Sequence, residues 1–326
     1  MNLTAAQLDR ARGVLLGTAA GDALGAGYEF GPPLPDETLV EMKGGGNFGW
    51  EPGEWTDDTS MALAIAEVAA TGADLREASA QDRVVARWAQ WALTAKDIGA
   101  QTAQVLGEIR EGTAVEALAA SRDLHERTGR TAGNGSLMRT APVALAYLGD
   151  EAGLTQAAAQ VSRLTHVDPE AGEACVLWCQ AIRHAVLAGD LDARAGLGHL
   201  PQASRAAWAG RLDAAEKARP SDFVRNGWVV EALQAAWCAI ATTPVPAGDP
   251  ASGSSRADHL RLALEAAVRG GRDADTVAAI AGGLLGAAWG ASAVPAGWQS
   301  ALHGWPGLRA RDLAGLATAI VTGGQP

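Results

Sequence analysis

The sequence predicts an all-α fold formed by a single domain over residues 1–326. Alanine and leucine dominate the composition, and runs of β-branched or aromatic residues are scarce. Long segments repeat apolar residues at the spacing of one helix face. Hydrophobic residues make up 48% of the chain, which is enough for a large buried core. We expect one domain because no composition shift or fixed-period repeat divides the sequence.

Glycine- and proline-rich breaks delimit the predicted helices in order along the chain. The predicted helices span 6–25, 58–71, 79–93, 99–119, 151–162, 169–189, 226–241, 257–270 and 275–291. The breaks lie at 31–36, 43–53, 129–135, 244–254 and 295–307. Within them, the stretch TTPVPAGDPASGSS (242–255) is typical of an exposed, mobile loop.

Two predicted helices carry glycine at every fourth position. These glycines are Gly13, Gly17, Gly21 and Gly25 in the first helix, and Gly282, Gly286 and Gly290 in the last. Interior glycine costs roughly 1 kcal/mol relative to alanine, so its repetition on one face indicates a second backbone close by. The same spacing pairs helices in membranes, but Asp22 and the flanking charges argue against that here. We expect the two helices to pack together with their ends close in space.

Charge and composition exclude several classes of function. The net charge of −11 disfavours nucleic-acid binding, which requires a basic surface. Every stretch long enough to cross a bilayer contains a charged residue, so no membrane span is predicted. The N-terminus lacks the basic start and apolar block of a signal peptide. Three cysteines (Cys175, Cys179 and Cys238) suit free buried thiols in a reducing compartment, which predicts a cytoplasmic protein.

Two acidic clusters stand at predicted helix starts, in GEWTDDTSMA and in GGRDADTVAAIAGG. Their oxygen-bearing residues are Thr56, Asp57, Asp58, Asp273, Asp275 and Thr276. Three consecutive residues inside a helix fan across about 200°, so they converge on one point only at a terminus. Either cluster alone is most often a helix cap. Brought together, four carboxylates repel unless cations intervene, and hard oxygen ligands select Mg²⁺, Mn²⁺ or Ca²⁺.

Further segments offer groups that could contact a substrate. Glu29 ends GDALGAGYEF between two aromatic residues, although a lone glutamate after a helix is usually exposed. RTAGNGSLMRTAP (130–142) offers backbone N–H groups to an anion ahead of a resuming helix, although GNG is also an ordinary turn. His166 precedes Asp168-Pro169, which is typical of a helix N-cap. Asp97 lies in a short break and could simply start the following helix.

Together these segments resemble the ADP-ribosylglycohydrolase superfamily. The matching stretches are GDALGAGYEF, GEWTDDTSMA, DIGAQT, GNGSLMR, LTH and DADTVAAIAGGLLGA, over about residues 10–291. The resemblance implies an orthogonal helix bundle that binds two Mg²⁺ or Mn²⁺ ions through the two acidic clusters. It implies a substrate-binding set of Gly99, Thr102, Arg130, Thr131, Gly133, Asn134, Gly135, Ser136, Met138 and His166. Arg130, Thr131 and Ala132 replace the Gly-Ser-Tyr of the ADP-ribosylserine type, which argues against serine-linked substrates.

The resulting hypothesis is hydrolysis at the anomeric ribose carbon of ADP-ribose attached to a protein side chain or to a small molecule. Asp58 or Glu29 would accept the proton of the attacking water, and Asp97 would protonate the leaving group or contact the opened ribose. Asp97 favours an arginine acceptor, and family precedent favours a monomer. The alternatives are a binuclear-metal nucleotide phosphoesterase, a non-catalytic ADP-ribose-binding protein, and a helical scaffold whose aspartates are only caps.

Overall fold

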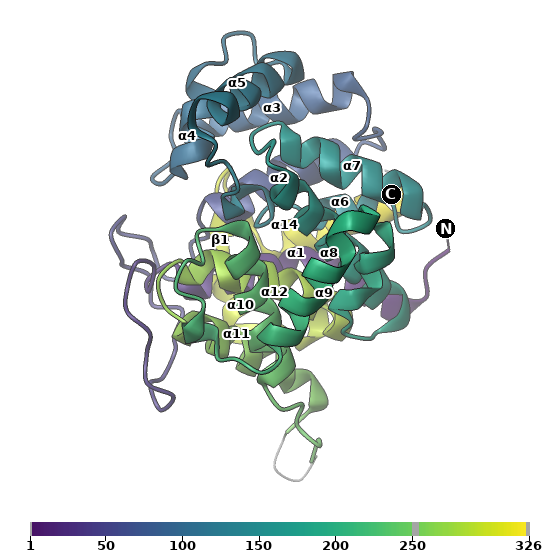
Figure 1. Cartoon of the computed structure of the whole chain (residues 1–326). Coiled ribbons are helices and arrows are strands. Elements are labelled where there is room, and N and C mark those ends of the chain that lie inside the picture. Colours follow the sequence, from purple (N-terminus) through teal and green to yellow (C-terminus); the bar gives the residue numbers. More distant parts are fainter. Residues whose placement is uncertain (1, 250–253, 324–326) are drawn as a thin grey trace.

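Two helices from opposite ends of the sequence form the centre of the molecule (Figure 1). The computed structural model describes residues 2–249 and 254–323. In it, α1 (Ala5–Gly25) runs antiparallel to α12 (Ala274–Trp289), and residues 274–288 of α12 are buried on every face. A helix that is apolar all round needs such a central position. Their pairing supports the expectation of one domain, which stays a prediction.

The glycine ladder brings the two backbones into direct contact, as predicted. A Cβ atom added to Gly17 would lie 2.1 Å from the carbonyl oxygen of Gly282, and one added to Gly286 would lie 1.9 Å from that of Gly13. At the other end of α1, a Cβ on Gly25 would lie 2.3 Å from the Cα of Asp275. The prediction that the helix ends lie close together is therefore confirmed, and the approach places the second acidic cluster beside the end of α1.

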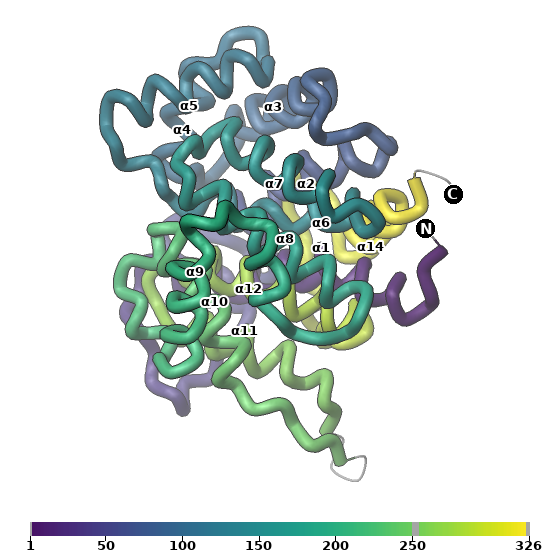
Figure 2. Tube along the Cα trace, turned by 45° about the vertical axis from the view of Figure 1, so that its right-hand side comes forward, coloured from purple at the N-terminus to yellow at the C-terminus, as the bar shows by residue number. Residues whose placement is uncertain are grey.

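The other helices surround this pair. They are α2 (Asp57–Ala69), α3 (Ala78–Ala92), α4 (Ala100–Gly107), α5 (Ala114–Thr128), α6 (Ala141–Ala146), α7 (Glu151–Arg163), α8 (Pro169–Ala188), α9 (Gln202–Ala215), α10 (Val229–Thr242), α11 (His259–Arg269), α13 (Ala296–Ala301) and α14 (Ala310–Thr322). Short 3-10 turns are η1 (Asn134–Ser136), η2 (Ala193–His199), η3 (Pro220–Asp222), η4 (Arg256–Asp258) and η5 (Ala291–Ala293). In both views α3, α4 and α5 gather at one end of the molecule and α9, α10 and α11 at the other (Figures 1 and 2).

Strand structure within the described part of the chain is limited to one short antiparallel hairpin and a few isolated bridges. Strand β1 (His303–Gly304) pairs with β2 (Leu308–Arg309), with His303 opposite Arg309. The prediction of an all-α fold is confirmed. Taken one by one, the described helices are too short or too polar to cross a membrane. The three cysteines are free and buried, as predicted.

Some helix boundaries differ from the prediction. The expected helix over 99–119 is two helices, because a chain reversal at Gly112, with φ of +75°, precedes a capping box in which Thr113 and Glu116 start α5. The helix after the GNG segment begins only at Ala141, since η1 intervenes, and α10 begins at Val229 rather than at 226. Helices α9, α13 and α14 were not predicted. Helix α9 buries only Trp208, Leu212 and Ala215, too narrow a face for a clear apolar pattern.

The predicted loop over 242–255 is partly described. Residues 250–253 lie outside the described residues. Of the remainder, Pro244, Val245 and Gly248 are exposed, and Asp249 pairs with Ser254 through two backbone hydrogen bonds of 2.9 and 3.0 Å. The exposure expected from the sequence is therefore confirmed for these described residues.

Candidate metal centre

Carboxylates from the ends of three helices converge on two adjoining groups. Oxygens of Asp22, Asp58 and Asp275 lie within 4.8 Å of one another, and so do oxygens of Glu29, Asp273 and Asp275. Asp275 belongs to both groups. The two acidic clusters of the sequence therefore meet in space, as their positions at helix starts suggested.

Asp22 contributes a carboxylate that sequence reasoning did not assign to the site. It is fully buried in α1 and accepts hydrogen bonds from the backbone N–H of Thr56 at 2.9 Å and of Thr59 at 3.0 Å, and from the Thr59 hydroxyl at 2.6 Å. These bonds tie the first turn of α2 to α1. A signal was present in the sequence, since Asp22 is the sole charged residue between Arg12 and Glu29.

The acidic side chains at the two helix starts do not act as ordinary caps. The N-cap residues of α2 and α12 are Thr56 and Asp273, and neither side chain makes a capping hydrogen bond. Instead, the hydroxyls of Thr56 and Thr276 lie 3.2 and 3.4 Å from Oδ2 of Asp58. This argues against a scaffold whose aspartates only start helices, and it places both threonine oxygens beside the carboxylates.

Asp57 lies at the edge of the cluster, towards α4. Its Oδ2 accepts a hydrogen bond of 3.3 Å from the backbone N–H of Gly99, and its Oδ1 lies 3.4 Å from the Thr56 hydroxyl. A cavity of about 90 Å³ is lined there by Asp57, Asp97 and Trp50, among other residues. The N-cap of α4 is Gly99, so Asp97 does not start that helix. Asp97 instead lines the same small cavity.

Backbone strain beside the cluster positions Glu29. Phe30 and Arg272 both have positive φ, of 60° and 62°, which is uncommon for residues with a side chain. The Phe30 N–H donates to the Arg272 carbonyl at 2.6 Å, and the Arg272 N–H donates to the Gly31 carbonyl at 2.7 Å. This two-bond clamp fixes Glu29 next to Asp273. Strained residues held by their surroundings are frequent at functional sites.

Burial and mutual repulsion raise the pKa values of these carboxyl groups. Burial is the larger cause and nearby aspartates add to it, raising the pKa of Asp57 to about 8 and that of Glu29 to about 9. The pKa values of Asp58 and Asp275 are raised well above the usual range for the same two reasons. The pKa of Asp22 is raised by burial to about 6, less than the others because four hydrogen bonds stabilise its charge.

The donor set fits hard divalent cations. Three buried oxygens, Glu29 Oε2, Asp58 Oδ1 and Asp275 Oδ1, have no hydrogen-bond partner. Leaving a buried carboxylate oxygen unpaired is costly, so these atoms need a partner of positive charge. The two groups contain oxygen donors alone, which favours Mg²⁺, Mn²⁺ or Ca²⁺ over zinc.

The glycine-containing loop, Gly133–Gly135, is hydrogen-bonded directly to this cluster. Asn134 donates from Nδ2 to Oδ2 of Asp273 at 2.7 Å and to the Asn226 carbonyl at 2.9 Å. Asn226 in turn accepts a hydrogen bond of 3.3 Å from the backbone N–H of Asp273. Asn226 had no recognisable signal in the sequence, because an Asn-Gly pair is an ordinary turn.

Several predicted substrate-binding residues meet at this loop. A Cβ on Gly135 would lie 3.2 Å from Nε2 of His166 and 3.5 Å from the Thr102 hydroxyl, and a Cβ on Gly133 would lie 3.4 Å from the same Nε2. Gln101, which sequence reasoning missed, donates to the carbonyls of Thr131 and Thr165 at 3.1 and 2.8 Å. The structure therefore brings Gly99, Thr102, Gly133, Asn134, Gly135 and His166 to one region.

Three predicted substrate-binding side chains are directed elsewhere. The Thr131 hydroxyl pairs with Nδ1 of His125, and the Ser136 hydroxyl accepts a hydrogen bond of 2.9 Å from Ser162. Met138 is part of the buried apolar core. For Thr131, Ser136 and Met138, the backbone is therefore the part left to contact a ligand. Arg130 is exposed, and its guanidinium makes no ion pair with any residue that the structure describes, so its predicted contact with substrate stays a prediction.

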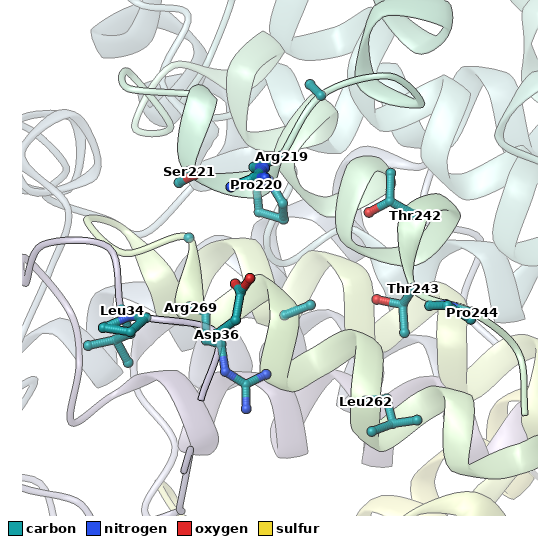
Figure 3. A pocket seen from close by; sticks show the side chains of 14 residues that line it. Leu34, Asp36, Arg219, Pro220, Ser221, Thr242, Thr243, Pro244, Leu262 and Arg269 are labelled. Carbon is teal, nitrogen blue, oxygen red and sulfur yellow. The ribbon is translucent and has the colours of Figure 1, made fainter. Parts of the chain in front are cut away.

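A larger hollow of about 710 Å³ lies away from the carboxylates (Figure 3). Residues 34–36, 218–221, 242–244 and part of α11 line it. None of the acidic cluster residues belongs to its lining, so size alone does not identify the chemically equipped site.

The raised pKa values predict how stability depends on pH and on metal. In the unfolded chain these carboxyls titrate near their usual values, whereas folding raises the pKa of Asp57 to about 8 and that of Glu29 to about 9. The folded state therefore holds the extra protons, and metal-free protein should lose stability as pH rises from about 7 to about 9. Histidine side chains ordinarily titrate below this range, so the expected loss of stability comes from the carboxyl groups.

Thermal melting followed by circular dichroism, with chelator or with excess Mg²⁺ at each pH, tests this expectation. The stabilisation by Mg²⁺ should increase with pH, because ions compete with protons for the same oxygens. A metal-induced shift in melting temperature that stays constant or decreases over this range would contradict the assignment.

Comparison with known proteins places these features in one family. The family model for ADP-ribosylglycohydrolase matches residues 3–325. The chain is 33% identical over 298 residues to ADP-ribosylarginine hydrolase Tri1 of Pseudomonas putida (strain GB-1), covering 89% of this chain and 73% of that protein. It is 30% identical over 307 residues to ADP-ribosyl-[dinitrogen reductase] glycohydrolase of Rhodospirillum rubrum, covering 90% of each.

A solved structure resembles the whole chain. It is described as an ADP-ribosylglycohydrolase-related protein complex, and it superposes with a TM-score of 0.72 at 30% sequence identity. The match covers 98% of this chain and 99% of the other. The likeness therefore extends over the fold as well as the motifs.

Proposed function

The chain belongs to the ADP-ribosylglycohydrolase family, and we propose that it removes ADP-ribose from arginine side chains with two bound Mg²⁺ or Mn²⁺ ions. The observation that carries the proposal is the pair of carboxylate groups joined by Asp275, with buried oxygens that lack a partner. Such a pair suits two cations that share a ligand.

The cations would be held by residues already described. Asp22, Asp58 and Asp275 form one set of donors and Glu29, Asp273 and Asp275 the other, with Thr56, Asp57 and Thr276 beside them. Bound there, divalent cations supply Lewis acidity that orients ribose hydroxyls and lowers the pKa of water.

The carboxyl groups of the chain would move the protons. Asp58 and Glu29 each have a second carboxylate oxygen beyond the one offered to a cation, so either could take a proton from the attacking water. Positive charge develops on the anomeric carbon as the glycosidic bond breaks, and the surrounding carboxylates stabilise it. Burial raises the pKa of Asp97, which favours a protonated side chain able to donate to the departing group.

The glycine-containing loop would hold the pyrophosphate. Gly133 and Gly135 present backbone without side chains, and Asn134 fixes their distance from the cluster through Asp273. Binding the remote phosphates there would align the reacting ribose carbon with the carboxylates. The side chains of Thr131, Ser136 and Met138 would support the conformation of this loop without contacting the substrate.

Two features support an arginine acceptor. Asp57 and Asp97 line the small cavity beside the cluster, where their carboxyl oxygens would accept hydrogen bonds from a guanidinium group. Two curated relatives, from Pseudomonas putida and Serratia proteamaculans, carry the name ADP-ribosylarginine hydrolase.

A substrate panel tests the proposal. Purified protein would be incubated with arginine-, serine-, glutamate- and acetyl-linked ADP-ribose, each with Mg²⁺, Mn²⁺ or chelator, and free ADP-ribose followed by chromatography. We expect release from the arginine conjugate, with kcat/KM at least about tenfold above the serine conjugate, and no release with chelator. Release of phosphate instead would indicate a phosphoesterase, and binding without release would indicate a non-catalytic protein.

The monomer that family precedent favours stays a prediction. Three free, buried thiols suit a reducing environment, which supports the predicted cytoplasmic location.

A further inference from the structure

Arg139 is a fully buried arginine without an acidic partner. It is 0% exposed and makes no ion pair with any residue in the described ranges. Its guanidinium lies 3.9 Å from the centre of the Trp88 ring, its Nη1 lies 3.7 Å from the Met61 sulfur, and its Nε has no partner. An uncompensated buried charge is costly, so retaining it calls for a reason other than stability.

The guanidinium connects to a histidine through one hydroxyl. Arg139 Nη2 donates to Thr165 Oγ1 at 2.6 Å, and Thr165 Oγ1 lies 2.7 Å from Nδ1 of His166. Arginine has no acceptor, so the hydroxyl must accept from it. Among the described residues, the remaining partner of this hydroxyl is Nδ1 of His166, so the hydroxyl proton is directed at that nitrogen. Nδ1 is then an acceptor, and the ring proton lies on Nε2.

The protonated side of His166 faces the glycine-containing loop. A Cβ atom added to Gly133 or Gly135 would lie 3.4 or 3.2 Å from its Nε2. This Nε2 has no hydrogen-bond partner among the residues described. Burial, together with the nearby charge of Arg139, lowers the pKa of His166 well below its usual value, so the ring is neutral. The Gln101 side chain donates to the carbonyl of Thr165, the residue before His166, and so fixes the backbone beside the histidine.

We propose that Arg139, acting through Thr165, is a positioning residue that holds His166 as the neutral Nε2–H tautomer, which donates to an anionic oxygen bound at the Gly133–Gly135 loop. The oxygen would belong to the pyrophosphate or to an adjoining ribose, so this proposal rests on the proposed function for its ligand. The buried charge of Arg139 adds a positive potential beneath the same loop, which favours an anion there.

Nitrogen-15 NMR of histidine in the folded protein tests the tautomer directly. His166 would be assigned by comparison with His166→Gln, since the chain has six histidines. We expect a pyridine-type Nδ1 and a pyrrole-type Nε2 that persist from neutral to mildly acidic pH. Added ADP-ribose with Mg²⁺ should shift Nε2 and leave Nδ1 almost unchanged. A protonated Nδ1 in the unmodified protein would overturn the proposal without any variant.

A matched pair of variants tests the connection. Thr165→Val removes the hydroxyl at nearly constant shape, and Thr165→Ser retains it. We expect Thr165→Val to mix the two tautomers and to weaken ADP-ribose binding by roughly tenfold in calorimetry, the effect of one lost hydrogen bond. Thr165→Ser should restore both. Equal tautomer populations and affinities in the two variants would contradict the role of Arg139 and Thr165.

These readouts separate this proposal from the proposed function. The tautomer and the affinity for ADP-ribose do not depend on catalysis, so a protein that binds ADP-ribose but releases none from conjugates could still confirm the connection. Conversely, hydrolysis of conjugates with an Nδ1–H tautomer would support the function and reject the connection. If Thr165→Val does not fold, the spectra of the unmodified protein with and without ADP-ribose still decide the outcome.

Discussion

Replacing Asp275 by asparagine is expected to lower kcat for ADP-ribosylarginine by about a thousandfold or more. Asp275 is the one carboxylate common to both groups at the acidic cluster, and its Oδ1 is buried without a partner. The substitution removes a negative charge from both candidate cation positions while hardly changing side-chain volume. We therefore expect metal binding and turnover to fail together.

The measurement combines kinetics with metal analysis. Protein would be stripped with chelator and reloaded, and bound Mg²⁺ or Mn²⁺ would be measured by mass spectrometry alongside kcat. Asp150→Asn is the matched control, because Asp150 also stands at a helix start, where it caps α7 by accepting from the Gly153 N–H at 2.8 Å. Asparagine is an equally good cap, so this control should keep full activity.

Stability should move in the opposite direction from activity. Without metal, burial and the neighbouring carboxyl groups make the charged form of Asp275 costly, and neutral asparagine avoids that cost. The metal-free variant should melt at or above the temperature of the metal-free parent, and it should gain less on adding Mg²⁺. A variant that keeps near-normal kcat with two bound ions would reject the ligand assignment.

The acidic cluster could be predicted in large part from sequence because its members occupy positions with few alternatives. Side chains such as Asp57 and Asp275 converge only where a helix begins, and the like charges of such clusters require a cation once they meet. The glycine spacing of α1 and α12 likewise has one main explanation, which is backbone contact. These features depend on local geometry and charge, which the sequence carries directly.

Other parts of the site depend on contacts between distant segments, which one sequence does not reveal. In the sequence, Asp22 is an isolated charge in an apolar helix, and only the structure shows that it accepts a hydrogen bond from Thr56 at the start of α2. Asn226 is likewise an ordinary turn residue in the sequence, and only the structure shows its hydrogen bond with Asp273. Thr131 and Ser136 were assigned to substrate because they stand in the right stretch, but their side chains bond to His125 and Ser162 instead. A linear motif identifies the loop without fixing which side chains enter the pocket.

The second large effect is expected at the centre of the fold, where Gly286→Ala should destabilise the protein by about 3 kcal/mol or more. The new Cβ would lie 1.9 Å from the Gly13 carbonyl oxygen and 2.5 Å from its carbon. Both are backbone atoms of a buried helix, so no side-chain rotation can relieve the clash. Such a loss is a large fraction of the 5–15 kcal/mol typical of a folded domain, and the melting temperature should fall by about 4 °C or more.

Gly210→Ala is the control for this substitution. Gly210 lies inside α9, and a Cβ there would meet no atom within 4 Å. Alanine should therefore stabilise the protein by about 0.5–1 kcal/mol, since it restricts the unfolded chain and favours helix. If the same substitution lowers stability at Gly286 and raises it at Gly210, the contact between backbones is the cause of the loss. Equal melting temperatures for Gly286→Ala and the parent would show that α1 and α12 do not approach so closely.

The same clash should weaken metal binding at a distance. Asp22 lies on α1 and Asp275 at the start of α12, and the glycine contacts between these helices set the separation of the two carboxylates. Forcing the helices apart at Gly286 moves rigid elements rather than single side chains, because close-packed interiors transmit strain. Any Gly286→Ala protein that folds should therefore bind Mg²⁺ more weakly than the parent, whereas Gly210→Ala should bind it normally. Calorimetric titration with Mg²⁺ below the melting temperature of each variant measures this difference.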